Sequence, residues 1–405
     1  MLAGIVVIAG AAAGVPALAS VGVILGALAL AREAWFRRGL RGLHYQRLLS
    51  TTRCVQGDEV AVTVSLWNRS LLPIGRVTSD DQASHDIRFR EHSAGVSAVA
   101  GRPLLSNVWT LLPFERVERR FHLLADRRGR LVLGPVHLET ADLFSGIAAA
   151  GDVHMPGQLI VAPRSVPIRQ ADGRPRWSPV ARPATGFPED PALVAGVRPY
   201  QAGDPPRRIH WKATARTGQP SSKHYEASRQ REVVVVVDIQ TEPGRMPSGR
   251  HDPDLVEAIC VTAASLLRDG LAGGVRCGLA AAAYTHRPSA QVRILPGTGV
   301  AQLLALMDAL GRASPMASGP FESLLGGLGR WLPQTTDLVV VTGRAITPYV
   351  PILIRLRSLG FGIRVVVVGQ VAQARAADGR GAGFRVSAAD LTPDWRTADA
   401  LALAG

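Results

Sequence analysis

The feature that most constrains the fold is a change of pattern near residue 232, after which apolar strands and helices alternate. Val233 to Val237 is an unbroken β-branched run that ends at Asp238, and such a run is typical of a strand buried on both faces. Helix-like segments follow at 255–267, 300–310 and 349–359, and strand-like segments at 275–282, 338–342 and 363–368. This alternation predicts that residues 232–405 form an α/β domain with a parallel sheet.

Residues 55–162 show a different pattern, in which short alternating runs are separated by turn residues. Val60, Val62, Val64 and Leu66 share one face of a predicted strand. Further short runs lie at 117–123, 131–133 and 136–138. Such spacing predicts a small β-sandwich over 55–162. The proline-rich residues 163–231 are expected to form a long connection, of the kind that tends to be functional or to wrap a domain surface.

The N-terminal residues 1–31 contain no charged side chain, and a transmembrane helix needs about 20 apolar residues. Gly14 and Pro16 can divide the stretch, so residues 1–35 are expected to be a membrane anchor of one span or a tight hairpin. A cleaved signal peptide would have a basic start and a shorter apolar core. The arginines of the basic juxtamembrane segment 36–54 predict a plasma-membrane protein whose soluble domains lie in the cytoplasm.

The net charge of +14 is concentrated in two stretches. Residues 32–53 hold six Arg and one acidic residue, and residues 164–231 hold 13 Lys or Arg and five acidic residues. Basic surfaces often face anionic partners, so anionic membrane lipid is the partner expected near residues 32–53. Aromatic residues make up only 5% of the chain and no nucleic-acid-binding motif occurs, which argues against nucleic acid.

Several classes of enzyme are excluded by missing motifs. The sequence has no Gly-Lys followed by Ser or Thr, no HExxH and no G-x-S-x-G, so a P-loop, a zincin site and a nucleophile elbow are absent. Cys54, Cys260 and Cys277 form no CxxC pair and favour a reducing compartment. We therefore expect no cofactor and no enzymatic activity.

The most informative segment, residues 196–216, reads GVRPYQAGDPPRRIHWKATAR. Asp204 suits a helix N-cap, Pro205 the first helical position and Gly218 the C-terminal stop, which predicts one short helix from about 205 to 217. Its basic residues spread over about half the circumference of such a helix, unlike the two-faced pattern of a membrane-surface helix. They are Arg207, Arg208, His210, Lys212 and Arg216.

One interpretation of the segment is a structural clamp. Asp204 would cap the helix and pair with Arg207 or Arg198, while Tyr200 and Trp211 would fill the junction between the domains.

The other interpretations are functional. Arg208 and Lys212 could point outward as a recognition site for an anionic group or an acidic partner. Asp204 and His210 could be written as the base and acid of an enzyme, although no nucleophile or metal set accompanies them.

This segment resembles the family called domain of unknown function 58. The resemblance rests on Arg198, Tyr200, Gly203, Asp204, Arg207, Ile209, His210, Trp211, Ala215 and Arg216. It extends to Arg47, Gly57-Asp58, Asn68-Arg69-Ser70, Arg128-Gly129-Arg130 and Leu133-Gly134-Pro135. Residues 142–146 depart from the family's usual Asp-Pro-Phe-Gly-Leu. In order, the match covers about residues 1–240.

The resemblance implies a membrane-anchored protein with a β-rich segment and a von Willebrand factor A-like domain, encoded beside a MoxR-type AAA+ ATPase. The metal-binding type of that domain has Asp-x-Ser-x-Ser after its first strand, which supplies oxygen ligands for Mg²⁺. Here the positions are Asp238, Gln240 and Glu242, and Arg344 would repel a cation. We therefore predict a degenerate metal site at Asp238 that holds no metal.

The function expected from these features is that of a membrane-anchored, cytoplasm-facing interaction or assembly protein that acts with a MoxR-type ATPase. One alternative is a module that binds polyanions or lipid headgroups, and another is an enzyme of unrecognised class centred on Asp204 and His210. A salt titration of binding separates the first two, because contacts to phosphates give a steep salt dependence.

Overall fold

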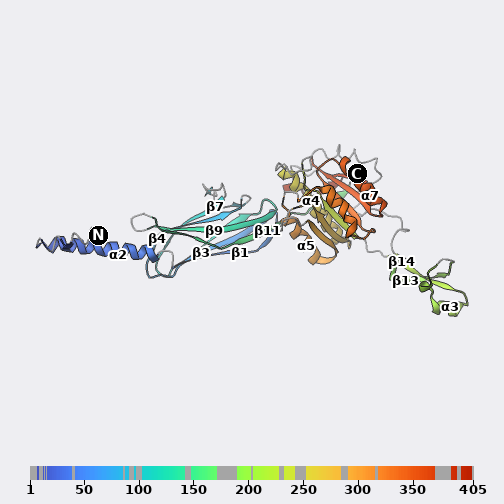
Figure 1. The fold of residues 1–405 in the computed structure, drawn as a ribbon, viewed down its shortest axis with the longest axis horizontal. Coiled ribbons are helices and arrows are strands. Elements are labelled where there is room, and N and C mark those ends of the chain that lie inside the picture. Colours follow the sequence, from blue (N-terminus) through green and yellow to red (C-terminus); the bar gives the residue numbers. More distant parts are fainter. Residues whose placement is uncertain are drawn as a thin grey trace. The chain divides into compact units, whose positions relative to one another are not determined.

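The chain divides into two compact units, Met1–Val161 and Ala162–Gly405, whose elements are labelled in Figure 1. In this computed structural model the described residues are 7–8, 12, 14, 16–38, 42–84, 87–90, 95–96, 103–141, 147–170, 189–201, 204–227, 232–241, 252–283, 291–314, 318–369, 385–389 and 394–403. The boundary between the units falls one residue from the predicted end of the β-sandwich.

Helix α2 (Pro16–Arg38) opens the first unit. Within the described part of the chain, no helix combines the length and the apolar character that crossing a membrane requires. The described residues therefore do not show the predicted N-terminal anchor, and the predicted fold class is corrected to that of a mixed α/β, strand-rich chain. The physical reason is that Arg32 and Glu33 lie inside α2, so its uncharged part is shorter than the about 20 residues of a span. Most of residues 1–15 lie outside the described residues.

Two largely antiparallel sheets form the rest of the first unit. In order, the first sheet contains β1 (Leu43–Leu49), β3 (Glu59–Asn68), β8 (Arg116–Leu124) and β5 (Arg88–Phe89). The second contains β2 (Arg53–Val55), β11 (Gly157–Ala162), β9 (Gly129–Ala141), β4 (Ile74–Ala83), β7 (Pro103–Leu111) and β6 (Gly95–Val96), with β10 (Ile147–Val153) also paired to β9. Alternating side chains of both sheets share one core, as period-two strands require.

The first strand of this unit was missed in the sequence because it contains a buried arginine. In β1, Leu43, Tyr45 and Arg47 all point inward, so the charged side chain hides the apolar alternation. Strands β1 and β2 thus occupy much of the segment predicted as basic and juxtamembrane, residues 36–54. Since Arg47 is buried, its charge faces the core of the unit and not a lipid surface.

Arg47 joins the two sheets. Its guanidinium pairs with Asp81 of β4 and donates a hydrogen bond of 3.0 Å to the carbonyl oxygen of Leu133 in β9. The Tyr45 hydroxyl donates to the same Asp81 carboxylate at 3.0 Å. At Gly157 a Cβ atom would lie 2.8 Å from Nη2 of Arg47, so glycine is needed where β11 passes the guanidinium.

The second unit is built on a six-stranded sheet. Its order is β17 (Val292–Gly297), β16 (Arg276–Ala281), β15 (Glu232–Val237), β18 (Asp337–Thr342), β19 (Gly362–Val368) and β20 (Arg385–Ala389). Neighbouring strands are parallel except that β17 runs antiparallel to β16. The connection between those two strands is shorter than the dozen or more residues that a parallel crossover needs. The sheet is therefore mixed, and the predicted parallel sheet of a von Willebrand factor A domain is not shown.

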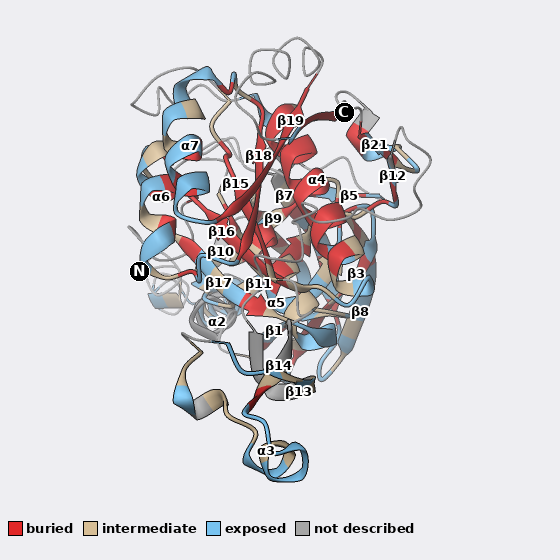
Figure 2. Cartoon of the chain, turned by 90° about the vertical axis from the view of Figure 1, so that its right-hand side faces the viewer, coloured by how far each residue is buried: buried red, intermediate tan, exposed pale blue. Residues whose placement is uncertain are grey.

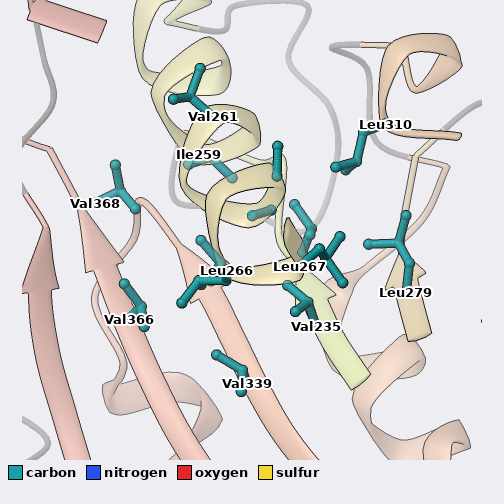
Figure 3. Close-up of a cluster of buried hydrophobic side chains, with 14 of the residues drawn as sticks. Val235, Ile259, Val261, Leu266, Leu267, Leu279, Leu310, Val339, Val366 and Val368 are labelled. Carbon is teal, nitrogen blue, oxygen red and sulfur yellow. The ribbon is translucent and has the colours of Figure 1, made fainter. Parts of the chain in front are cut away.

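Helices cover both faces of this sheet. One core contains α4 (Pro253–Ala272) and α5 (Gly299–Arg312) with Val233, Val235 and Val237, and Figure 3 shows side chains of α4 against the sheet. The other contains α6 (Phe321–Gly327), η3 (Leu328–Arg330), η4 (Thr347–Tyr349) and α7 (Val350–Ser358) with Val234 and Val236. Every valine of β15 is thus buried, which confirms the predicted two-sided burial of this strand.

The C-terminal segment completes the core beside α4. Strand β12 (Ile168–Gln170) pairs in parallel with β21 (Leu401–Leu403), and η6 (Asp394–Arg396) precedes β21. The Trp395 side chain in η6 is fully buried. Arg164 donates a hydrogen bond of 3.0 Å to the carbonyl oxygen of Ala398, which fastens this segment to the start of the unit.

Candidate functional site

The segment singled out in the sequence forms a two-stranded hairpin that we call the basic hairpin. It consists of β13 (Glu189–Pro199), η2 (Pro206–Arg208), α3 (Trp211–Thr217) and β14 (Ser221–Ala227), with β13 and β14 antiparallel. Between Pro205 and Tyr225 the sequence has five Arg or Lys residues and no acidic one. The net charge of this stretch is therefore positive.

The predicted single helix from 205 to 217 is wrong at its start. Ile209 has an extended backbone and forms an isolated β-bridge with Ser222, which separates η2 from α3. His210 is the N-cap of α3, and its Nδ1 accepts a hydrogen bond of 3.0 Å from the Ala213 amide. The predicted stop is confirmed, because Gly218 ends α3 with a φ of 71°.

Asp204 ties the two strands of the basic hairpin together at the end where they lead into η2 and α3. Its Oδ1 accepts a hydrogen bond of 2.6 Å from Nη2 of Arg198. Its Oδ2 accepts from the Ser222 hydroxyl at 3.0 Å and from the Gln201 amide at 3.1 Å, while the Tyr200 hydroxyl donates to the Asp204 carbonyl oxygen at 3.1 Å. The predicted pairing with Arg198 is confirmed, but Asp204 ties the two strands together and does not cap a helix.

The Asp204 carboxylate makes the hairpin sensitive to acid. The hydrogen bond from Arg198, followed by that from the Gln201 amide, lowers the pKa of Asp204 to about 2. A carboxyl group whose pKa falls on folding stabilises the fold above its unfolded pKa of about 4 and loses that contribution as pH falls through the folded value. We therefore expect hydrogen exchange across β13 and β14 to speed up between pH 4 and pH 2, relative to Asp204→Asn measured at the same pH. Equal pH dependence in both proteins would contradict this role.

The outer side of α3 is exposed. Trp211 is 70% exposed, Lys212, Ala215 and Arg216 are also exposed, and no residue of α3 is buried, as the pale blue colour of this helix in Figure 2 shows. Trp211 is therefore not part of the core of its own unit, and its predicted place at a junction between domains stays a prediction. An exposed tryptophan next to the exposed Lys212 and Arg216 makes α3 a candidate contact surface, because tryptophan and arginine are enriched among the residues that dominate protein interfaces.

The remaining predicted residues of the segment occupy different environments. Arg208 is half-buried, so its expected outward position is not shown. Gly203 and the side chain of Arg207 lie outside the described residues. His210 and Asp204, proposed as an acid and base, each serve a local backbone turn through the hydrogen bonds given above.

A second polar site lies at the carboxyl end of the six-stranded sheet, between β15 and β18. From β15 the chain continues to β16 on one side of the sheet, and from β18 it continues to β19 on the other side. Ligands of α/β sheets commonly bind at the carboxyl end of two such strands, where the strand order reverses. Here Asp238 is fully buried. Its Oδ2 accepts hydrogen bonds from the Thr342 hydroxyl at 2.9 Å, the Tyr349 hydroxyl at 3.1 Å and Nε of Arg344 at 3.1 Å, and its Oδ1 accepts from the Gln240 amide at 3.1 Å.

The charge of Arg344 lies where a bound cation would contact Asp238. Burial raises the pKa of Asp238, and the positive charge of Arg344 acts in the opposite direction. Burial, followed by the Asp238 charge, raises the pKa of Tyr349, so its hydroxyl remains a donor. Among the described residues, no group of three or more His, Cys, Asp or Glu side chains could hold a metal ion. Tyr349 escaped the sequence analysis because nothing in its local pattern points to Asp238.

The fold and these sites define a chain with an antiparallel β-sandwich unit, followed by a mixed α/β unit that includes a basic hairpin. Residues 196–376 match the family described as "Protein of unknown function DUF58", a range that takes in most of the basic hairpin and the strands from β15 to β19.

A relative of this chain is the "Uncharacterized protein YeaD" of Bacillus subtilis (strain 168). It is 23% identical over 248 residues, which are 60% of this chain and 56% of the relative. The chain thus matches little more than half the length of that protein.

Two solved structures resemble parts of the chain. A CARDB domain from Pyrococcus furiosus is 9% identical over 29% of this chain and 91% of that domain, with a TM-score of 0.20. An alpha-2-macroglobulin fragment from Escherichia coli is 17% identical over 34% of this chain and 21% of that chain, with a TM-score of 0.23. Likeness at these TM-scores supports no argument about function.

Proposed function

We propose that the protein is an interaction or assembly protein that binds a MoxR-type AAA+ ATPase through its basic hairpin. The observation that supports this most directly is the 70% exposed side chain of Trp211, next to the exposed Lys212 and Arg216. Tryptophan and arginine are the residues most enriched among those that dominate binding energy at protein interfaces.

The Asp204 hydrogen bonds support this proposal because they order the hairpin before binding. Arg198, Gln201 and Ser222 all donate to one carboxylate, which joins the two strands below α3. A surface held in its bound conformation loses less conformational entropy when a partner docks. The identity of the partner rests on the family resemblance, and the family match begins at residue 196, within the basic hairpin.

The test is capture of the ATPase by the full chain, with and without ATP. We expect Trp211→Ala to weaken capture about tenfold, which corresponds to about 1.4 kcal/mol. The matched control is Leu304→Ala, because Leu304 is 57% exposed on α5 and lies in a different element. Equal capture by both variants and the unaltered protein would contradict the proposal.

A further inference from the structure

The outer side of α3 has two stripes of different chemistry. Trp211 and Ala215 are one helical turn apart, and so are Lys212 and Arg216, so each pair lies on one side of the helix. All four side chains are exposed, whereas Ala213 and Thr214 are half-buried. The Thr214 hydroxyl accepts a hydrogen bond of 3.1 Å from the Ser221 amide, which fixes the inner side of α3 on β14.

We propose that α3 binds an acidic polypeptide segment, in which two carboxylates meet Lys212 and Arg216 and an apolar side chain packs against Trp211 beside Ala215. This inference rests on the proposed function and specifies the chemistry of the partner. Ala215, one turn from Trp211, is exposed and has only a methyl group as its side chain. Two cations one turn apart match two carboxylates one turn apart on a facing helix.

Charge and apolar area together favour a polypeptide over a phosphate polyanion. Lys212 and Arg216 are exposed on α3, which contains no acidic residue, so this side of the helix is complementary to an acidic partner. A phosphate backbone would use the cations but would leave Trp211 without an apolar contact, unless bases stacked on it. A folded or helical peptide satisfies both stripes at once.

The probe is a synthetic peptide with glutamates one helical turn apart and leucines beside them. Its counterpart has glutamine at each glutamate position. We expect the full chain to bind the glutamate peptide at least about tenfold more tightly than the glutamine peptide. Binding is followed by the change in tryptophan fluorescence as the peptide is added. Because the chain has 7 Trp residues, the change is assigned to Trp211 if it is lost in Trp211→Phe.

Variants of the chain separate the two stripes. We expect about tenfold weaker binding in Trp211→Ala and in the double variant Lys212→Gln/Arg216→Gln, with unchanged melting because these side chains are exposed. The matched control is Arg330→Gln/Arg355→Gln, which also removes two positive charges from exposed residues of the second unit. If the control weakens binding as much as the α3 variants, net charge explains the effect and the proposal fails.

Other anionic probes decide between the classes of partner. Tighter binding of a single-stranded oligonucleotide, or of vesicles containing phosphatidylserine, than of the glutamate peptide would overturn the inference. Peptide binding without capture of the ATPase would support the inference and contradict the proposed partner. Capture of the ATPase that survives the α3 variants, with no peptide binding, would overturn the inference and place the contact elsewhere.

Discussion

Replacing Arg47 by alanine is expected to lower the free energy of unfolding of the first unit by about 3–5 kcal/mol. The side chains of Arg47 and Asp81 are each only 1% exposed, so the variant retains a buried carboxylate without its counterion. Burial already raises the pKa of Asp81, against the opposing effect of Arg47. The loss should therefore shrink as pH falls, because protonation removes the buried charge. The measurement is urea unfolding followed by hydrogen exchange in residues 43–161.

Two variants test this explanation. Arg116→Ala removes an arginine whose ion pair with Glu118 is exposed, with both side chains at 47%, and it should change stability by no more than about 0.5 kcal/mol. The double variant Arg47→Met/Asp81→Leu replaces both charges with apolar groups and should recover much of the loss. A loss in Arg47→Ala no larger than in Arg116→Ala would show that the buried pair does not join the sheets.

Replacing Trp395 by alanine is expected to destabilise the second unit by about 3–5 kcal/mol, because it leaves a large cavity. The side chain is 0% exposed and belongs to the core that contains α4, Leu401 and Leu403. Its Nε1 also donates to Oδ1 of Asp254 at 3.4 Å. The measurement is thermal and urea unfolding of the full chain, with hydrogen exchange in α4 as the local readout.

The matched control is Trp211→Ala, which removes the same side chain from a position that is 70% exposed. Its stability should change by no more than about 0.5 kcal/mol. If Trp395→Ala unfolds at the same temperature as Trp211→Ala, the C-terminal segment does not contribute to the core as the structure indicates. The cavity argument would also be contradicted if hydrogen exchange in Trp395→Ala became faster in β12 and β21 but not in α4.

Local pattern was enough to identify several strands. In β3 the alternation of Val60, Val62, Val64 and Leu66 predicted one buried face, and all four side chains are buried. In β15 the unbroken valine run predicted burial on two faces, which the burial of Val233 to Val237 confirms. These predictions succeed because the period of a strand relates sequence spacing directly to the face that a side chain occupies.

Predictions failed where a charged residue or a short connection decided the outcome. Arg47 lies on the inward face of β1 and concealed that strand, since its burial depends on Asp81, 34 residues away. The short connection after β16 turned an expected parallel sheet into a mixed one. The predicted N-terminal anchor is not shown by the described part of the chain, in which α2 runs from Pro16 through Arg32 and Glu33 to Arg38.

The sequence by itself determined the periodic strands, the helical stop at Gly218 and the presence of a strongly basic segment near residues 196–216. Only the tertiary structure decided that Asp204 bonds to Ser222 across the hairpin and that Asp238 meets Tyr349, 111 residues further along the chain. It also decided that Trp211 is exposed while Trp395 is buried. Periodicity reports only which face of an element is apolar, whereas the partner of a polar or aromatic side chain depends on which distant elements pack against it.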